Sequence, residues 1–347
     1  MLQADDIITL AQGVYRLRAP LASSAYGVVW QARAQHGLPD VALKLINRQQ
    51  MERAPGALQA RWMGSAHREI DFLRSLAPWD ERHIVRLLDS GAHDGLPVMA
   101  LELMEGDLAG RVAAQAPRVL QVLDWLGQVN QALAKVHQYG WLYLDLKPAN
   151  VLLTIQGAVK LADFGTNRLR SALPADAYAG TASWQAPEQF FPNERHIYET
   201  DQRSDYFALG AMFYFLVTGG VPLRFCSDCG DAYRAHQANG ASSLLARHGG
   251  AMPATLHEDE AALFRQRFAH ADGGADATWS PADSAADEAL ALLRALLACE
   301  RRNRPQHALD ISRKLAAIRR RVATPVSNVR PGPFRFANVR VDARRAA

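Results

Sequence analysis

Two carboxylates and a carboxamide lie close together in the sequence near the middle of the chain. Asp145 opens the run Asp-Leu-Lys-Pro-Ala-Asn, which ends at Asn150, and Asp163 opens Asp-Phe-Gly thirteen residues after that. Carboxylate and amide oxygens are hard ligands that suit Mg²⁺, and a carboxylate can also accept a proton from a hydroxyl group. A base aimed at a hydroxyl, with magnesium held beside it, is what phosphoryl transfer needs.

A β-hairpin is predicted between these two groups of polar residues. Residues 151–155 and 159–162 are short apolar runs around Gln156-Gly157, which is a turn signal. Before them, residues 119–138 place apolar side chains at helical spacing. The polar residues should therefore lie on turns, beside a helix and at the two ends of a hairpin.

The amino-terminal part is predicted to be rich in β-strands. Residues 14–34 and 41–46 cluster β-branched and apolar residues around turn signals, which suits an antiparallel sheet. Residues 83–88 and 96–103 are also expected to be strands. The pattern loosens at residues 104–107, where we place the boundary between two parts of the chain.

One helix is predicted within this β-rich part, at residues 65–76. Ile70, Leu73 and Leu76 lie on one stripe at helical spacing. Glu69 lies four residues before Leu73 and so shares its face. The helix should carry a carboxylate into the interior.

The motifs, in this order, resemble the eukaryotic-type Ser/Thr protein kinase family, of which bacteria also have members, over roughly residues 12–320. Ala-Pro-Glu at residues 186–188 extends the match, and the three motifs together are far more specific than Asp-Phe-Gly alone. The resemblance implies an α+β, two-lobed kinase fold, with a small β-rich N-lobe that holds one regulatory helix and a larger, mainly helical C-lobe. The expected divisions are an N-lobe at residues 12–104, a C-lobe at residues 105–322 with an inserted loop at about residues 224–283, and a basic, Pro-containing tail at residues 323–347.

The resemblance also assigns catalytic roles. Lys44 ends Val-Ala-Leu-Lys, like the family's third-strand lysine that neutralises the ATP phosphates, and Glu69 is its expected partner. Asp145 matches the catalytic base, and Lys147 matches the lysine that steadies the transferred phosphoryl group in Ser/Thr-specific members. The expected catalytic residues are thus Asp145, Lys147, Lys44 and Glu69, with Asn150 and Asp163 as ligands of Mg²⁺.

An ATP site follows from the same resemblance. Leu101 matches the gatekeeper, and the backbone of Glu102 and Met104 should meet the edge of the adenine. Apolar side chains on both faces suit a flat heteroaromatic ring. The expected nucleotide contacts are Leu21, Ala22, Ser23, Ser24, Ala25, Gly27, Val29, Ala42, Lys44, Leu101, Glu102, Met104 and Leu152, with Val29 and Ala42 above the adenine and Leu152 below it.

Scaffold roles are implied for three charged residues. Glu188 resembles the glutamate that ends the activation segment and pairs with an arginine, here Arg304. Asp205 resembles the buried helix aspartate that accepts hydrogen bonds from the catalytic-loop backbone. A buried charge must be paired, so the loss of either partner should be costly.

The chain departs from the family pattern in its phosphate loop and before its catalytic aspartate. Only Gly27 of three loop glycines is kept, and Ala22 and Ser24 replace the others, which restricts the backbone conformations open to the loop.

Before the catalytic aspartate, Tyr143-Leu144 replaces His-Arg. Tyr143 can stack near Phe164, but Leu144 cannot bind a phosphate. We therefore expect activity that does not require phosphorylation of the activation segment, whose hydroxyl residues are Thr166, Ser171, Tyr178, Thr181 and Ser183. Thr181 stands apart, because the matching threonine of Ser/Thr kinases bonds the catalytic aspartate and lysine.

Cysteines and composition limit the class of protein. Cys226 and Cys229 form half of a zinc motif, but no second pair follows at the required spacing, so a substrate-selecting or partner-selecting loop is favoured over a metal site. Cys299 is expected in the core beside a helix at residues 289–298.

Three cysteines and the absence of a signal-peptide pattern predict a cytoplasmic protein. Residues 206–223 lack charge but end in Thr-Gly-Gly-Val-Pro, which favours a buried helix over a membrane span.

The net charge of +4 is unevenly distributed. From Arg319 onward the chain has eight arginines and one acidic residue, Asp342. This segment is expected to be extended or disordered. It could contact an anionic partner or remain solvated, and no nucleic-acid-binding fold is predicted.

The leading hypothesis is a Ser/Thr protein kinase that transfers the γ-phosphate of Mg-ATP to a hydroxyl of a protein substrate. The altered phosphate loop and Leu144 leave a second hypothesis open, a pseudokinase that binds nucleotide and signals by its conformation. A third is a small-molecule phosphotransferase of the aminoglycoside type. That type lacks both the Lys147 equivalent and the Ala-Pro-Glu segment, which this chain has.

Overall fold

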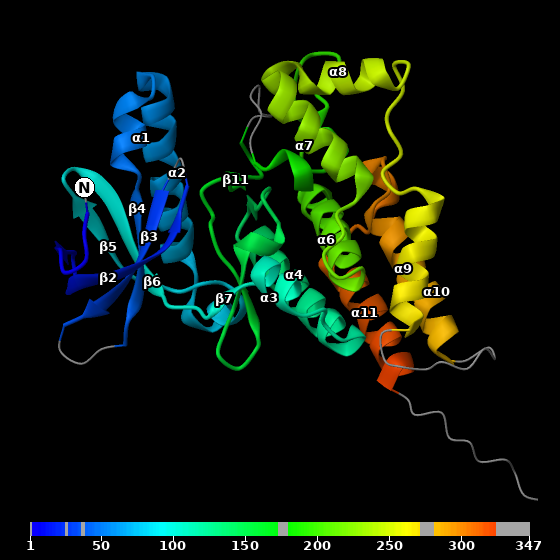
Figure 1. The fold of residues 1–347 in the computed structure, drawn as a ribbon, viewed down its shortest axis with the longest axis horizontal. Helices are drawn as coiled ribbons and strands as arrows, with labels where there is room; N and C mark the ends of the chain where they lie inside the picture. The colour runs from blue at the N-terminus through cyan, green and yellow to red at the C-terminus, as the bar shows by residue number, and fades with distance from the viewer. Residues whose placement is uncertain (1, 25–26, 36–38, 173–179, 271–280, 324–347) are drawn as a thin grey trace, which may run out of the picture.

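The computed structural model describes residues 2–24, 27–35, 39–172, 180–270 and 281–323. An antiparallel sheet with two helices forms the amino-terminal part, and a mainly helical part follows (Figure 1). This confirms the predicted α+β class and the two-lobed arrangement. The chain passes between the parts through a single connection after strand β6 (Leu96–Glu102).

The amino-terminal sheet has six strands in the order β1-β2-β3-β4-β6-β5, and each pairing is antiparallel. The inward side chains of β4 alternate with less buried ones, as expected for a strand that packs on one face. A three-stranded sheet, β10-β9-β7, and a two-stranded sheet, β11-β8, flank the segments that carry Asp145 and Asp163. The strands are β1 Ile7–Thr9, β2 Val14–Ser23, β3 Gly27–Ala34, β4 Val41–Ile46, β5 Leu87–His93, β6 Leu96–Glu102, β7 Gly106–Asp107, β8 Trp141–Leu142, β9 Val151–Leu153, β10 Val159–Leu161 and β11 Arg168–Leu169.

Helix α2 packs against the sheet and carries Glu69 inward, as predicted. The helix is longer than the sequence indicated, because it spans Gly56–Ser75 and begins after Pro55. Glu69 is 2% exposed, and its neighbour Leu73 is buried on the same face. The hairpin of β9 and β10 also forms as predicted, with Leu161 opposite Val151.

The carboxyl-terminal part is built around α6 (Gln202–Val217), which is buried along nearly its whole length. A capping box at Asp201 begins this helix, and Thr218 ends it. No helix in the described part of the chain is long and apolar enough to cross a membrane. The helices are α1 Arg48–Arg53, α2 Gly56–Ser75, α3 Leu108–Ala114, α4 Val119–Gln138, α5 Pro187–Phe190, α6 Gln202–Val217, α7 Arg224–His236, α8 Gly240–Arg247, α9 Glu258–His270, α10 Pro281–Leu296 and α11 Ala308–Ala323.

Three predictions about the fold are wrong. The strand expected at residues 83–88 begins only at Leu87, because Pro78 starts a 3-10 helix, η1 (Pro78–His83), that occupies the chain before it. The region expected to be a loop at about residues 224–283 contains α7, α8 and α9, since buried side chains lie four residues apart in it, as Phe225 and Cys229 do in α7 and Phe264 and Phe268 in α9. Residues 271–280 of that region lie outside the described residues. Cys299 is exposed, because α10 ends at Leu296 and the chain turns away from the core.

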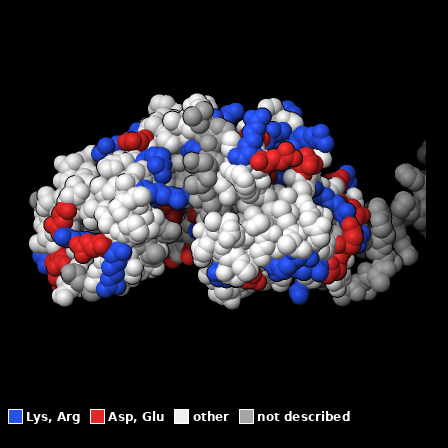
Figure 2. Space-filling view, turned by 90° about the horizontal axis from the view of Figure 1, so that it is seen from above, with Lys and Arg blue, Asp and Glu red and all other residues white. Residues whose placement is uncertain are grey.

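The basic segment is helical where it begins. Arg319 and Arg321 belong to α11 and pair with Asp124 at 2.7 Å and Glu288 at 2.9 Å. The expectation of an extended chain is therefore wrong for residues 319–323, whereas residues 324–347 lie outside the described residues. On the face seen in Figure 2, Lys and Arg side chains are interspersed with Asp and Glu over the helical part.

Candidate active site

Lys44 joins two carboxylates that come from distant parts of the sequence. Its Nζ lies 2.7 Å from Glu69 Oε2 and 2.8 Å from Asp163 Oδ1. Strand β4 carries the lysine, helix α2 the glutamate, and the turn after β10 the aspartate. Asp163 thus joins the expected pair of Lys44 and Glu69 in one ionic cluster.

The charges in this cluster determine one another's protonation. The lysine ammonium holds the pKa of the Asp163 carboxyl below its ordinary value. Burial by itself would lower the pKa of Lys44, but Asp163 and Glu69 together outweigh it and raise that pKa. Lys44 is therefore a cation and Asp163 an anion near neutral pH, as a phosphate-binding and metal-binding pair requires.

Asp145 and Lys147 lie side by side with the hydroxyl of Thr181. Lys147 Nζ donates to Asp145 Oδ2 at 3.0 Å and to Thr181 Oγ1 at 2.7 Å. Asp145 is 7% exposed, and its Oδ1 has no hydrogen-bond partner in the described part of the chain. A buried carboxylate oxygen without a partner is available to accept a hydrogen bond from a substrate hydroxyl. The contact between Lys147 and Thr181 agrees with what the sequence predicted for this threonine.

Burial raises the pKa of Asp145, and the negative charge of Asp163 adds to this effect. The neighbouring Lys147 ammonium opposes it by favouring the carboxylate form. Lys147 is therefore the group that most favours the ionised form of Asp145. This gives Lys147 a role that can be measured through pH.

Asn150 and Asp163 offer oxygen atoms of the kind that suits Mg²⁺. The Nδ2 of Asn150 donates to Asp145 O at 2.9 Å and to Asp145 Oδ2 at 3.1 Å. This fixes which way the amide points, since its nitrogen is held by Asp145 and its Oδ1 is the atom left to act as a ligand. The donor set is an amide oxygen and an ionised carboxylate, so these residues fit the metal.

The catalytic loop is held from below by Asp205 of α6. Its Oδ2 accepts from Tyr143 N at 3.0 Å, and its Oδ1 accepts from Leu144 N at 2.7 Å. The sequence predicted these contacts. It did not indicate His137, whose Nε2 lies 2.8 Å from Asp205 Oδ2; the only signal was a histidine near the end of a helix.

Two residues of the site have backbone conformations that side chains rarely adopt. Leu144 has φ of 65° and Asp163 has φ of 56°. Such values are costly outside glycine and persist only where surrounding contacts impose them. At Leu144 the imposing contacts are the bond from its amide to Asp205 and the bond that its carbonyl accepts from Gln189 Nε2 at 3.0 Å.

Phe164 anchors the segment that carries Asp163. Its ring centroid lies 4.6 Å from that of Phe72 in α2 and 5.1 Å from that of Tyr143, and all three side chains are fully buried. Tyr143 therefore packs on Phe164 as predicted. Phe72 was missed, although it lies one turn after Glu69 in the same helix and so couples the position of the glutamate to that of Asp163.

The residues expected to contact adenine lie around the connection between the two parts. Ala42 is opposite Leu101 in the sheet, and Leu101 is buried. We call the connection after β6 the hinge. Leu152 is opposite Asp107 in the three-stranded sheet, so β7 connects the hinge to the strand that carries Leu152. Met104 and Leu152 are half-buried and pack against the helical core.

Strands β2 and β3 are paired up to the residues that flank the tip of the phosphate loop. Ala22 and Val29 are opposite each other, as are Ser23 and Val28, and Ser24 N donates to Gly27 O at 2.8 Å. The hydroxyl of Ser24 also accepts from Gly27 N at 3.1 Å. Ser24, which replaces a glycine of the family pattern, therefore accepts a hydrogen bond from a backbone amide of its own loop. Leu21 is exposed, and Ala25 lies outside the described residues.

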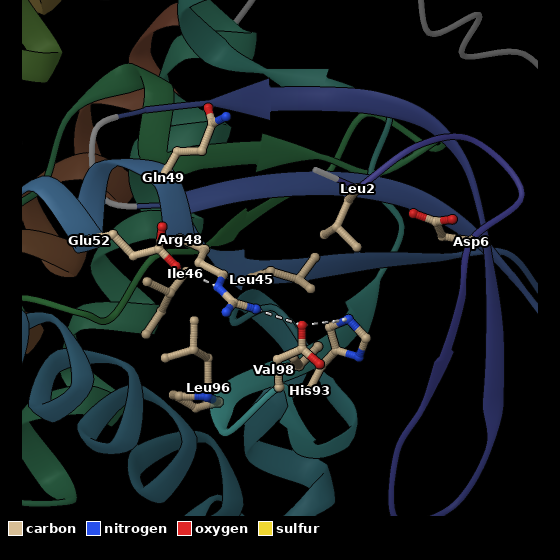
Figure 3. A pocket seen from close by; sticks show the side chains of 12 residues that line it. Leu2, Asp6, Leu45, Ile46, Arg48, Gln49, Glu52, His93, Leu96 and Val98 are labelled. Carbon is tan, nitrogen blue, oxygen red and sulfur yellow. Dashed lines mark hydrogen bonds and ion pairs between the residues drawn. The ribbon is translucent and has the colours of Figure 1, made fainter.

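A separate hollow of about 510 Å³ lies on the amino-terminal sheet (Figure 3). Arg48 of α1 reaches across it to Asp94 at 2.8 Å, and Glu52 pairs with the same arginine. None of the residues that line it belongs to the predicted nucleotide or catalytic set. The hollow is thus a different surface from the cluster around Asp145.

Cys226 and Cys229 are buried in the first turns of α7. Burial raises the pKa of the Cys226 thiol to about 12 and also raises that of Cys229. Thiols in that state are poor metal ligands and poor nucleophiles. The described residues contain no group of three or more His, Cys, Asp or Glu side chains arranged to hold a metal ion.

Comparison with known proteins agrees with this geometry. A family model described as a protein kinase domain matches residues 15–313. The chain is 32% identical over 231 residues to the DNA damage-responsive serine/threonine-protein kinase RqkA of Deinococcus radiodurans, which covers 63% of this chain and 32% of that protein. It is 29% identical over 230 residues to the serine/threonine-protein kinase PknL of Mycobacterium bovis, covering 63% of this chain and 53% of that protein. A probable serine/threonine-protein kinase, pknA2 of Bifidobacterium longum, is 28% identical over 224 residues, which cover 63% of this chain and 28% of pknA2.

The chain spans about half the length or less of these curated relatives. The family match nevertheless extends over most of the chain and includes every residue of the ionic and catalytic clusters. From the fold, the motifs and this match together, the chain belongs to the protein kinase family.

Proposed function

We propose that the protein is an active Ser/Thr protein kinase that transfers the γ-phosphate of ATP to a serine or threonine hydroxyl of a protein substrate. The residues proposed to act are Asp145 as base, Lys147 beside the transferred group, Lys44 with Glu69 on the phosphates, and Asn150 and Asp163 on Mg²⁺. We propose the N-lobe at residues 12–104 and the C-lobe at residues 105–322. When bound, Mg²⁺ would supply charge neutralisation at the phosphates.

One observation carries this proposal: Lys44 contacts Glu69 and Asp163 at the same time, while Lys147 contacts Asp145 and Thr181. The residues proposed to bind phosphate, to hold the metal and to act as the base are thus each held by contacts to another proposed site residue. Phosphoryl transfer depends mainly on positioning and electrostatics, so the mutual contacts of these charged groups favour catalysis over scaffolding.

Radiolabelled ATP with a basic protein substrate tests the proposal. The wild-type protein should incorporate phosphate on serine or threonine, and Lys44→Ala should lose incorporation because the ATP phosphates lose their cation. Lys314→Ala removes an exposed lysine of α11 and should retain it. Binding of ATP by the wild type without any transfer would instead indicate the nucleotide-binding pseudokinase.

We also propose that activity does not require a phosphate on the activation segment. Leu144 is 7% exposed, and its hydrogen bonds to Asp205 and Gln189 are made by its backbone. Its side chain is uncharged, so a phosphate would find no cation at this position. Variants without a hydroxyl at Thr166, Ser171 and Ser183, and Tyr178→Phe, should each remain active; Tyr178 lies outside the described residues. The requirement of any one of them for activity would contradict this proposal.

The pH dependence should report the contact between Lys147 and Asp145. A protonated Asp145 cannot accept the substrate proton, so activity should fall as the pH drops through a pKa that burial has raised. Lys147→Met removes the charge that favours the carboxylate, so the acidic limb of kcat/KM should move to higher pH. Lys314→Met should leave the limb in place, and an unmoved limb in Lys147→Met would refute the assignment.

A further inference from the structure

An ion pair at the hinge takes no part in the steps proposed above. Lys160 of β10 places its Nζ 2.5 Å from Oε1 of Glu102, the last residue of β6. The lysine side chain is 11% exposed and that of the glutamate is 23% exposed. The pair therefore lies largely out of solvent and connects the amino-terminal sheet to the carboxyl-terminal part.

The same carboxylate holds a third piece of chain. Arg86 N donates to Glu102 Oε1 at 2.8 Å, and Glu102 N donates back to Arg86 O at 3.1 Å. Arg86 in turn pairs with Glu81 of η1 at 3.3 Å. Glu102 thus fixes the segment before β5, the hinge and β10 relative to one another.

Both partners are attached to residues proposed to contact adenine. The backbone of Glu102 is itself one of the proposed contacts, at the edge of the ring. Lys160 is opposite Leu152 across the β9–β10 hairpin, and Leu152 is the proposed floor. The ion pair therefore links the residue at the proposed edge of the site to the strand beside its proposed floor.

We propose that Lys160 is a positioning residue for nucleotide binding, acting through Glu102 to hold the hinge in its binding conformation before ATP arrives. The inference rests on the proposed function, because it assumes that ATP binds at the hinge. A site that is ordered in advance pays less entropy on binding, so its affinity is higher. The catalytic groups around Asp145 do not touch the pair, so the chemical step should be nearly unaffected.

Kinetics of Lys160→Met test this. The Kd and KM for ATP should rise about five- to tenfold, while kcat stays within about twofold. Lys160→Arg can still donate to Glu102 and should recover most of the affinity. Lys135→Met removes an ion pair of similar length, 2.6 Å from Asp80, that does not touch the hinge, and it should leave the KM for ATP unchanged.

A measurement without nucleotide gives a second readout. The amides of Glu102 and Glu105 both donate hydrogen bonds at the hinge, the latter to Leu153 O at 2.9 Å. Their hydrogen exchange should be faster in Lys160→Met than in the wild type or in Lys135→Met. Unchanged exchange, unchanged ATP affinity or an increase in kcat would overturn the inference. If the wild type neither binds ATP nor transfers phosphate, the proposed function is what fails, and the exchange rates still decide whether Lys160 orders the hinge.

Discussion

Asp145→Asn is expected to lower kcat for phosphate transfer by roughly a thousandfold, since a base contributes about two to four orders of magnitude. Asparagine has nearly the same shape but cannot take up the proton of an attacking hydroxyl. Asp145 is held by Lys147 through Oδ2, and its Oδ1 has no hydrogen-bond partner among the described residues. The substitution removes the negative charge that these two oxygens share. Steady-state transfer from labelled ATP to a protein substrate measures the loss.

The affinity for ATP should change little in Asp145→Asn, because Lys44, Glu69 and the hinge are untouched. The two measurements together separate a loss of chemistry from a loss of binding. Asp124→Asn provides the matched control: it makes the same chemical change at a surface pair with Arg319 and should leave kcat as it is. A comparable loss in both variants, or full activity in Asp145→Asn, would remove Asp145 from the role of base.

Arg304→Met should lower the free energy of unfolding by about 3–5 kcal/mol, as is typical when one partner of a buried ion pair is removed. The Arg304 side chain is fully buried and donates to Glu188 Oε1 at 2.8 Å and Oε2 at 2.9 Å. It also donates to backbone carbonyls of Arg203, Ala298 and Cys299. Methionine would leave a buried carboxylate and three carbonyl groups with fewer donors. Urea denaturation followed by circular dichroism measures the change.

Two further variants make this prediction specific. Arg294→Met removes a partner of Glu258 at 2.8 Å, but both of those side chains are largely exposed, so its effect should be much smaller. Arg304→Lys should recover only part of the stability, because an ammonium cannot donate two parallel bonds to a carboxylate and reach the carbonyl groups as well. If Arg294→Met and Arg304→Met were equally destabilising, burial would not be the reason for the strength of this pair.

Much of the fold follows from local patterns. Helix α4 forms over the predicted residues 119–138, because an apolar stripe at helical spacing must be buried against something whatever the partner is. The β9–β10 hairpin forms because its turn signal fixes the connection. The prediction of a strand at residues 83–88 is wrong at its start. A 3-10 helix that begins at Pro78 runs to His83, and the pairing of β5 with β6 begins only at Leu87.

The region at residues 224–283 shows another limit of sequence patterns. Glycine, alanine and aspartate suggested a loop, but Phe225 and Phe264 are buried in the core and hold α7 and α9 there. Local propensity is weak compared with the burial of large side chains. Cys299 failed for a different reason: the sequence predicted it in the core, but α10 ends at Leu296, before the cysteine, and its side chain is exposed.

The sequence by itself determined the chemistry that the site can offer, because Asp145, Lys147, Asn150 and Asp163 lie on short segments whose order and residue types define it. It also indicated the partners Lys44 with Glu69 and Glu188 with Arg304 through the family resemblance. Only the tertiary structure decided how these groups are held: His137 behind Asp205, Phe72 against Phe164, and Lys160 on Glu102. Those contacts join residues far apart in the chain, and distance in sequence carries no signal about which side chains meet once the helices and strands have packed.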